Sequence, residues 1–230
     1  MTMIFKLSDK LLFPPPMLAR DDGLLAVGGD LSVERLLLAY SMGIFPWYSA
    51  GDPLLWWSPD PRMVLFPTEF HCSRRLARTL RQQVFTVTFD QAFARVVAGC
   101  AAPRPGQDGT WIVPEMQEAY CRLHAEGWAH SVECWQGHGL AGGLYGVSLG
   151  GCFFGESMFS RVADSSKVAM AVLVRRLLAW DFDLIDCQMK SDHLVRLGGR
   201  EISGSEFGRR LQEGLARPSR RGSWSGEVEG

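Results

Sequence analysis

The sequence predicts an α+β protein, in which a small, loop-rich N-terminal domain packs against a larger domain with a mixed sheet covered by helices. Two observations support this class. The first 62 residues hold seven of the 12 prolines and only one clear helix pattern, which is typical of a loop-rich unit. From about residue 63 on, three helix patterns precede three glycine-punctuated strands, and a long helix then leads to one further strand. A mixed sheet under helices buries the apolar faces of such elements.

Length and composition set the outer limits. A chain of 230 residues can bury a sizeable core. Hydrophobic residues make up 47% and charged residues 21%, as in ordinary globular proteins. We expect the small domain to span residues 1–62, the layered domain residues 63–216, and a disordered tail residues 217–230. A net charge of −1 argues against a nucleic-acid-coated protein but allows a local basic face.

The individual elements follow from capping residues and hydrophobic period. Ser32 is a typical N-cap for a helix that ends at Gly43, and Ser73 for a helix that reaches about Gln82. Alternating and apolar runs bounded by glycine-rich turns indicate strands. The remaining helices are expected at residues 91–100, 114–126 and 165–180, with two short ones after residue 188, and the strands at 63–66, 84–89, 131–135, 140–147, 151–157 and 184–188.

Two of these strands carry acidic residues in apolar surroundings. Residues 155–160 (GESMFS) and 184–188 (LIDCQ) are separated by one helix, so neighbouring strands can hold Glu156, Asp186 and Gln188 around one cleft. Asp186 and Gln188 lie two residues apart and project from the same face of their strand. A carboxylate in such a strand is either functional or paired, for example with backbone amides at the strand end. The cleft suits a cationic or amine substrate without metal chemistry.

A basic helix face is the second candidate for binding. Arg74, Arg78 and Arg81 are spaced to share one side of the helix that Ser73 begins, and Arg75 lies beside them. Most charge runs are only solvated faces. Because this helix has four arginines and no acidic residue, contact with phosphate groups is a reasonable second interpretation.

Several function classes find little support. The six cysteines include no C-x-x-C pair and lie mostly in apolar runs, which favours reduced thiols over disulfides or zinc ligands. The five histidines show no metal-ligand spacing, and no Ser–His–Asp arrangement is visible. Charges interrupt the first ten residues, and no apolar run reaches about 18 residues, so neither a signal peptide nor a membrane span is expected. These patterns predict a soluble, cytoplasmic protein without metal or membrane partners.

Eight short segments also occur in a characteristic order. Together they resemble the leucyl/phenylalanyl-tRNA–protein transferase family, the bacterial N-end-rule aminoacyltransferases. Each motif alone is weak, but the ordered set is specific and covers roughly residues 12–212. The segments are GLLAVGGDLS (23–32), GIFPWYS (43–49), WWSPDPR (56–62), GTWI (109–112), GGLYGV (142–147), GESMFS (155–160), SSKVA (165–169) and LIDCQ (184–188).

This resemblance implies a fold and an activity. The larger domain would be a GNAT-like catalytic domain. The reaction would move Leu, Phe or, less readily, Met from aminoacyl-tRNA to the α-amino group of a protein's N-terminal Arg or Lys, which makes that protein a substrate for regulated proteolysis. No metal or organic cofactor is implied, and we expect a monomer.

The resemblance also implies roles for individual residues. Asp186 and Gln188 match the central catalytic positions, with Glu156 as a further member of the site. Positions around the terminal adenosine and its aminoacyl group match Tyr40, Trp47, Trp111 and Tyr120. For the apolar pocket that selects the side chain, the candidates are Leu144, Phe153, Leu173 and Ile185. The tRNA phosphates would meet Arg74, Arg75, Arg78 and Arg81.

An amide oxygen is a very poor proton acceptor, so we expect Gln188 to orient the attacking amine by accepting its hydrogen bond rather than to act as a base. Asp186 would stabilise the ammonium-like charge that develops during attack. Glu156 would pair with the basic side chain of the acceptor or support this network.

Two alternatives remain at this point. A GNAT-type N-acyltransferase that uses coenzyme A needs a glycine-rich turn to cradle the pyrophosphate, whereas residues 160–166 (SRVADSS) contain no glycine. A non-catalytic module that binds tRNA ends or basic N-termini would use the same carboxylates without turnover.

Overall fold

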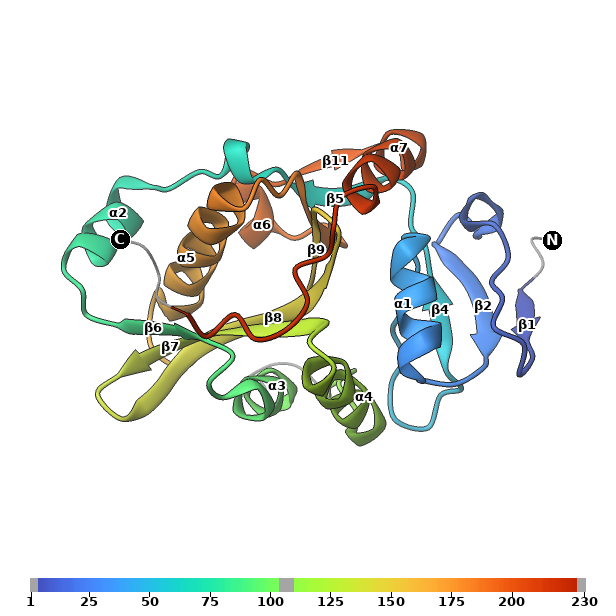
Figure 1. The fold of residues 1–230 in the computed structure, drawn as a ribbon, viewed down its shortest axis with the longest axis horizontal. Helices are drawn as coiled ribbons and strands as arrows, with labels where there is room; N and C mark the ends of the chain where they lie inside the picture. Colours follow the sequence, from blue (N-terminus) through green and yellow to red (C-terminus); the bar gives the residue numbers. More distant parts are fainter. Residues whose placement is uncertain (1–3, 104–109, 227–230) are drawn as a thin grey trace.

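The computed structural model describes residues 4–103 and 110–226 and contains a four-stranded and a seven-stranded sheet (Figure 1). The larger sheet is mixed and has helices on both faces, which confirms the predicted fold class. Most of the expected loop at residues 101–109 lies outside the described residues, as do the last four residues of the predicted tail. Within the described part of the chain, no helix has the length and apolar run needed to cross a bilayer.

The N-terminal part forms the smaller sheet, in the order β1-β2-β4-β3. Helix α1 begins where the sequence predicts, because the Ser32 hydroxyl accepts a hydrogen bond from the Arg35 backbone amide. The strands have only two to five residues and alternate with Pro- and Gly-rich turns, which explains why the sequence shows them only as turns. The elements are β1 (Phe5–Leu7), the 3₁₀ helix η1 (Pro16–Leu18), β2 (Leu24–Gly28), α1 (Val33–Ser41), β3 (Phe45–Pro46) and β4 (Leu55–Trp57).

The larger sheet has the order β11-β5-β10-β9-β8-β7-β6. Strands β9 and β10 pair in parallel, since a single helix, α5, carries the chain from the end of one back to the start of the other. The other neighbouring strands pair antiparallel. The strands are β5 (Arg62–Leu65), β6 (Thr86–Phe89), β7 (Ala129–Gln136), β8 (Gly139–Leu149), β9 (Cys152–Ser160), β10 (Leu184–Gln188) and β11 (Arg200–Ile202).

Helices cover the two faces of this sheet unequally. In Figure 1, α5 lies on one face, and α3 and α4 lie on the other, with α4 beside α1 of the N-terminal part. The buried apolar side chains accordingly form two cores, one around α5 and one shared by α1, α3 and α4. The helices are η2 (Pro67–Glu69), α2 (Arg74–Arg81), α3 (Phe93–Ala101), α4 (Pro114–Ala125), α5 (Ser165–Ala179), α6 (Asp192–Arg196) and α7 (Gly204–Leu215).

The C-terminal segment differs from the prediction of a disordered tail. Its described residues, 217–226, form no helix or strand, yet Trp224 is buried and only 4% exposed. The Trp224 ring stacks on His130 at 3.8 Å, and its backbone amide donates to Asp90 Oδ2 at 2.7 Å. A single large aromatic side chain therefore anchors a segment whose overall composition is that of a disordered one.

Candidate active site

Strands β9 and β10 separate at the centre of the larger sheet. Their parallel pairing ends at Asp186 and Phe154. On β9, Glu156 has no partner in the register with β8, and on β10, Cys187 has none in the register with β5. Both strands are therefore irregular where they part, and such bulges re-aim side chains. The gap between the two strands is the centre of the candidate site.

Asp186 is held by a basic residue that sequence reasoning missed. Arg62 Nε donates to Asp186 Oδ1 at 2.8 Å, and Arg62 Nη2 donates to Oδ2 at 2.7 Å. Both side chains are buried, at 1% and 0% exposure. The same Asp186 Oδ1 accepts the backbone amide of Gln188 at 2.9 Å. Asp186 is thus paired with a guanidinium and with a backbone amide at a strand end.

Glu156 is the centre of a second set of hydrogen bonds. Its Oε1 accepts from Tyr40 Oη at 2.8 Å and from Gln188 Nε2 at 2.9 Å, and its Oε2 accepts from Tyr120 Oη. The two tyrosine hydroxyls also contact each other at 2.7 Å. We call Tyr40, Tyr120, Glu156, Gln188 and Asp186 the polar network. It joins α1 and α4 to the two separating strands.

Burial sets the protonation of this network. It raises the pKa of Glu156 from 4.5 to about 7, although hydrogen bonds from Tyr120, Tyr40 and Gln188 favour the ionised form. Burial, followed by the charge of Glu156, raises the pKa of both tyrosines well above the ordinary value. The phenols therefore stay neutral donors, while Glu156 exchanges its proton near neutral pH.

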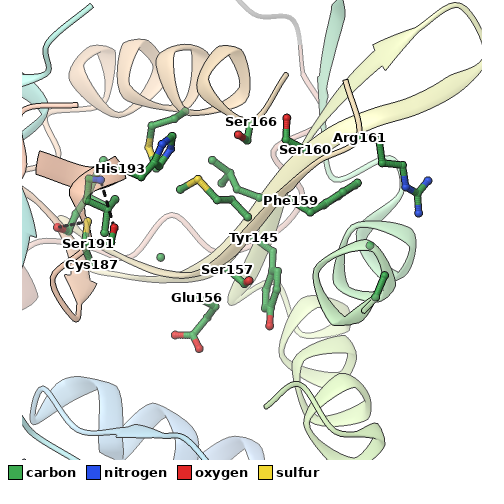
Figure 2. A pocket seen from close by; sticks show the side chains of 18 of the residues that line it. Tyr145, Glu156, Ser157, Phe159, Ser160, Arg161, Ser166, Cys187, Ser191 and His193 are labelled. Carbon is green, nitrogen blue, oxygen red and sulfur yellow. Dashed lines mark hydrogen bonds between the residues drawn. The ribbon is translucent and has the colours of Figure 1, made fainter. Parts of the chain in front are cut away.

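A pocket of about 720 Å³ adjoins the separating strands; most of its lining is apolar, but Glu156 and Arg161 also line it. Figure 2 shows Glu156 and Tyr145 on one side of β9, and His193 and Ser166 on the other. Of the side chains proposed for aminoacyl selection, Leu144, Phe153 and Ile185 line this pocket, as do Met158 and Met170, which sequence reasoning missed. Leu173 is fully buried but is not among the lining residues. The structure thus brings three of the four candidates together.

Gly155 lines the pocket at the point where β9 and β10 part. A Cβ atom added there would meet nothing closer than the Asp186 carbonyl oxygen at 3.6 Å. At Gly146, by contrast, an added Cβ would lie 2.2 Å from the Phe154 carbonyl oxygen. Packing within the chain therefore requires glycine at position 146, whereas at position 155 a Cβ atom would fit in ordinary van der Waals contact.

The aromatic candidates fall into two groups. Tyr40 and Tyr120 are fully buried in the polar network and present no ring face to solvent. Trp47 follows β3 and is 38% exposed, with its ring 5.5 Å from that of Trp57. Trp111 precedes α4 and is half-buried against the core shared by α1, α3 and α4. The two tryptophans keep surface on which a base could stack.

The arginines of α2 lie away from the gap. Helix α2 packs beside α5 at the end of the larger sheet remote from the N-terminal sheet (Figure 1). Arg74, Arg78 and Arg81 are exposed, as predicted for a basic face. Arg75 pairs with Asp164 at 3.0 Å, next to the first residue of α5. A ligand that reached both this helix and the pocket would have to be large.

The described residues contain no group of three or more His, Cys, Asp or Glu side chains that could hold a metal ion. The six cysteines are free thiols, and burial raises the pKa of Cys134 and Cys152 to about 12. The arrangement that the gap presents is a carboxylate, Glu156, bonded to the amide of Gln188 beside a largely apolar pocket.

Comparison with known proteins places the chain in a family. The model for the leucyl/phenylalanyl-tRNA protein transferase matches residues 64–212, and the model for the N-terminal domain of this transferase matches residues 29–60. The leucyl/phenylalanyl-tRNA–protein transferase of Desulforapulum autotrophicum is 59% identical over 223 residues, covering 96% of this chain and 97% of the relative. The enzyme of the same name from an Anaeromyxobacter species is 60% identical over 222 residues, covering 96% and 94%.

Among solved structures, L-PGS from Bacillus licheniformis aligns with a TM-score of 0.39 and 10% identity, over 73% of this chain and 53% of that one. The family assignment rests on the sequence matches, which extend over nearly the whole chain and include the strands that carry the polar network. The chain belongs to the leucyl/phenylalanyl-tRNA–protein transferase family, whose members are aminoacyltransferases.

Proposed function

We propose that this protein transfers Leu, Phe and, less readily, Met from aminoacyl-tRNA to the α-amino group of proteins with N-terminal Arg or Lys, and so marks them for regulated proteolysis. The observation that carries this proposal is the gap between β9 and β10. There an amide–carboxylate pair, Gln188 and Glu156, adjoins a largely apolar pocket that Glu156 also lines. The names of the curated relatives support the donor and the reaction class.

The apolar pocket would receive the side chain of the donor's amino acid. Leu144, Met158 and Ile185 give it an aliphatic wall, which favours Leu, Phe and Met. The aminoacyl ester would then lie beside Gly155, which lines the pocket. Trp47 and Trp111 would stack on the terminal adenosine, and the arginines of α2 would meet tRNA phosphates.

Gln188 would orient the attacking amine. Its Nε2 already donates to Glu156, so its Oε1 is the end of the amide that can accept a hydrogen bond from the amine. An α-amino group has an ordinary pKa of about 7.7–8, so a useful fraction is uncharged near neutral pH. Holding such an amine against an activated ester supplies much of the acceleration through the saved entropy of approach.

Glu156 is better suited than Asp186 to the positive charge that develops on the amine. The charge of Asp186 is already compensated by the buried guanidinium of Arg62, and Glu156, with a pKa of about 7, can hold a proton transiently. The amine nitrogen bonds to the carbonyl carbon, the bond from that carbon to the tRNA ribose oxygen breaks, and the proton from nitrogen ends on that oxygen. Glu156 would hold this proton between the two steps.

The acceptor's basic side chain then needs a site outside the buried polar network. Three hydrogen bonds and two covering tyrosines already occupy Glu156.

We further propose that residues 1–62 and 63–216 act as the two domains of a monomeric cytoplasmic enzyme that needs no metal or organic cofactor.

A donor exchange tests the proposal. The protein is incubated with an Arg-initiated peptide and either radiolabelled Phe-tRNA or labelled acetyl-coenzyme A. Label on the peptide only with Phe-tRNA is the expected result. Label from acetyl-coenzyme A would instead indicate a coenzyme-A-dependent acyltransferase, and tRNA binding without peptide labelling would indicate a binding module.

A further inference from the structure

Arg62 lies where three parts of the fold meet. It begins β5, and its side chain is 1% exposed. Its guanidinium lies 4.8 Å from the centre of the Phe45 ring, which belongs to the N-terminal sheet, and 4.7 Å from that of Phe207, which belongs to α7. Two aromatic rings thus confine the guanidinium and fix the direction of its donors.

Those donors define the position of Asp186. Nε and Nη2 of Arg62 each bind one oxygen of the carboxylate, in the planar two-point arrangement that only arginine provides. Asp186 then passes this constraint along β10, because its Oδ1 also accepts the Gln188 backbone amide. Among the described residues, Arg62 is the one side chain that forms an ion pair with Asp186.

Gln188 has a backbone conformation that needs such support. Its φ is +62°, in the left-handed region that residues other than glycine rarely adopt. In this conformation the Gln188 side chain turns toward Glu156, and its Nε2 donates to Oε1 at 2.9 Å. Four residues therefore form one chain of contacts, from Arg62 through Asp186 and Gln188 to Glu156.

We propose that Arg62 is a positioning residue for the transfer reaction: through its two-point contact with Asp186 it holds Gln188 in the left-handed conformation that aims the amide at the attacking amine. This role rests on the proposed function, because the amine is the acceptor's. In this proposal Asp186 acts by holding Gln188 in place and does not contact the substrate. Because Phe45 belongs to the N-terminal sheet and packs on Arg62, the position of that sheet then affects the conformation of Gln188.

Removing either charged partner alone would not test this, since it leaves an uncompensated buried charge that disrupts folding. The informative variant replaces both partners by apolar side chains of similar size, Arg62→Met with Asp186→Leu. Such replacements of buried ion pairs commonly preserve folding. We expect the melting temperature of this double variant to lie within a few degrees of that of wild type, and its affinity for Phe-tRNA to be equal. Its kcat for an Arg-initiated peptide should fall at least about a hundredfold.

Backbone amide hydrogen exchange gives a readout independent of turnover. In the wild-type protein, the Gln188 amide should be protected by Asp186 Oδ1. In the double variant we expect its exchange to accelerate at least about tenfold, while amides in the middle of β8 keep their protection. If the double variant kept kcat within threefold of wild type, or kept its Gln188 amide protected, the positioning role would be wrong.

Conservative variants supply a matched control. Arg62→Lys keeps the charge but cannot make the two-point contact, so kcat should fall about tenfold with KM for Phe-tRNA unchanged. Arg35 is equally buried and pairs with Asp30 at 3.1 Å, but it lies in the N-terminal part away from the gap. Arg35→Lys should leave kcat unchanged. Equal kcat for wild type and Arg62→Lys would overturn the proposal. If wild type were inactive, but the Gln188 amide were protected in wild type and exchanged faster in the double variant, only the proposed function would be overturned.

Discussion

Gln188 donates its side-chain amide to Glu156 at 2.9 Å, across the gap where β9 and β10 cease to pair. The two residues come from different strands: Glu156 is the unpaired residue of the irregularity in β9, and Gln188 directly follows the one in β10. This contact determines which end of the Gln188 amide is committed and which end is free for an amine. It also connects the residue that would orient the amine to a carboxylate whose pKa is about 7.

Replacing Gln188 tests orientation against base catalysis. Gln188→Ala should lower kcat by orders of magnitude and leave the dissociation constant for Phe-tRNA unchanged, because the apolar pocket that would hold the donor is intact. Gln188→Glu offers a true base but places a second carboxylate beside Glu156, so it should be no faster than wild type. Single-turnover transfer rates measure both variants, and aminolysis by Gln188→Glu much faster than wild type would refute the orienting role.

Stability should depend on pH through Glu156. Because its pKa is raised from 4.5 to about 7, the native state binds this proton more tightly than the unfolded state does. The contribution of Glu156 to the free energy of unfolding is therefore fully present below pH 4.5 and falls as the pH rises to about 7. Above that pH the contribution is absent. Glu156→Gln cannot ionise, so its free energy of unfolding should exceed that of wild type by up to about 3 kcal/mol at pH 8.

Urea denaturation of both proteins at pH 5 and pH 8 measures this difference. Glu118, whose side chain is 75% exposed, provides the control, since it lies at the surface outside the polar network. Glu118→Gln should change stability equally at the two pH values. If the stability of Glu156→Gln relative to wild type did not increase between pH 5 and pH 8, Glu156 would not be a buried carboxylate with a raised pKa.

Selection of the aminoacyl group should follow the residues that line the apolar pocket. Leu144→Phe narrows the pocket and should lower kcat/KM for Phe-tRNA more than for Leu-tRNA, by about tenfold or more. Leu173→Met is the control, because Leu173 is buried without lining the pocket. In the control variant, the ratio of the two kcat/KM values should stay within about twofold of the wild-type ratio. An equal loss of kcat/KM for both donors in Leu144→Phe would count against the pocket assignment.

The arginines of α2 should determine how tRNA binding responds to salt. Changing Arg74, Arg78 and Arg81 to Gln should weaken tRNA binding and reduce the slope of log K against log salt by about 0.9 per lost duplex phosphate contact. Arg75→Gln should have the smallest effect, because Arg75 pairs with Asp164. An aminoacyl-adenosine fragment without the tRNA body should react equally with all variants, and an unchanged salt slope in the triple variant would refute phosphate binding.

The order of the larger domain's elements could largely be predicted, because each has a clear capping residue or period. The strand at residues 184–188 was predicted with the bounds it has in the structure, and Ser32 and Ser73 cap the helices assigned to them. Strand β11 was not predicted. It has three residues, and pairing with β5 rather than its own sequence defines it as a strand.

Pairing over long sequence distances explains what the sequence could not show about the site. The partner of Asp186 lies 124 positions away in the chain, and nothing at Arg62 marks it as buried except its place beside an apolar strand. Leu173 was a candidate for the pocket because α5 is apolar on nearly all sides, which leaves no period from which to infer the side that faces a ligand. Sequence alone also does not show that the hydroxyls of Tyr40 and Tyr120, which match positions around the terminal adenosine and its aminoacyl group, bind Glu156.

The most direct test of the central claim is to locate the transferred group chemically. Wild type and Gln188→Ala are incubated with labelled Phe-tRNA and an Arg-initiated peptide that also contains an internal Lys, and tandem mass spectrometry locates the added Phe. We expect Phe on the α-amino nitrogen of the N-terminal Arg with wild type and nearly none with the variant. Phe on the internal Lys side chain, or equal transfer by both proteins, would contradict it.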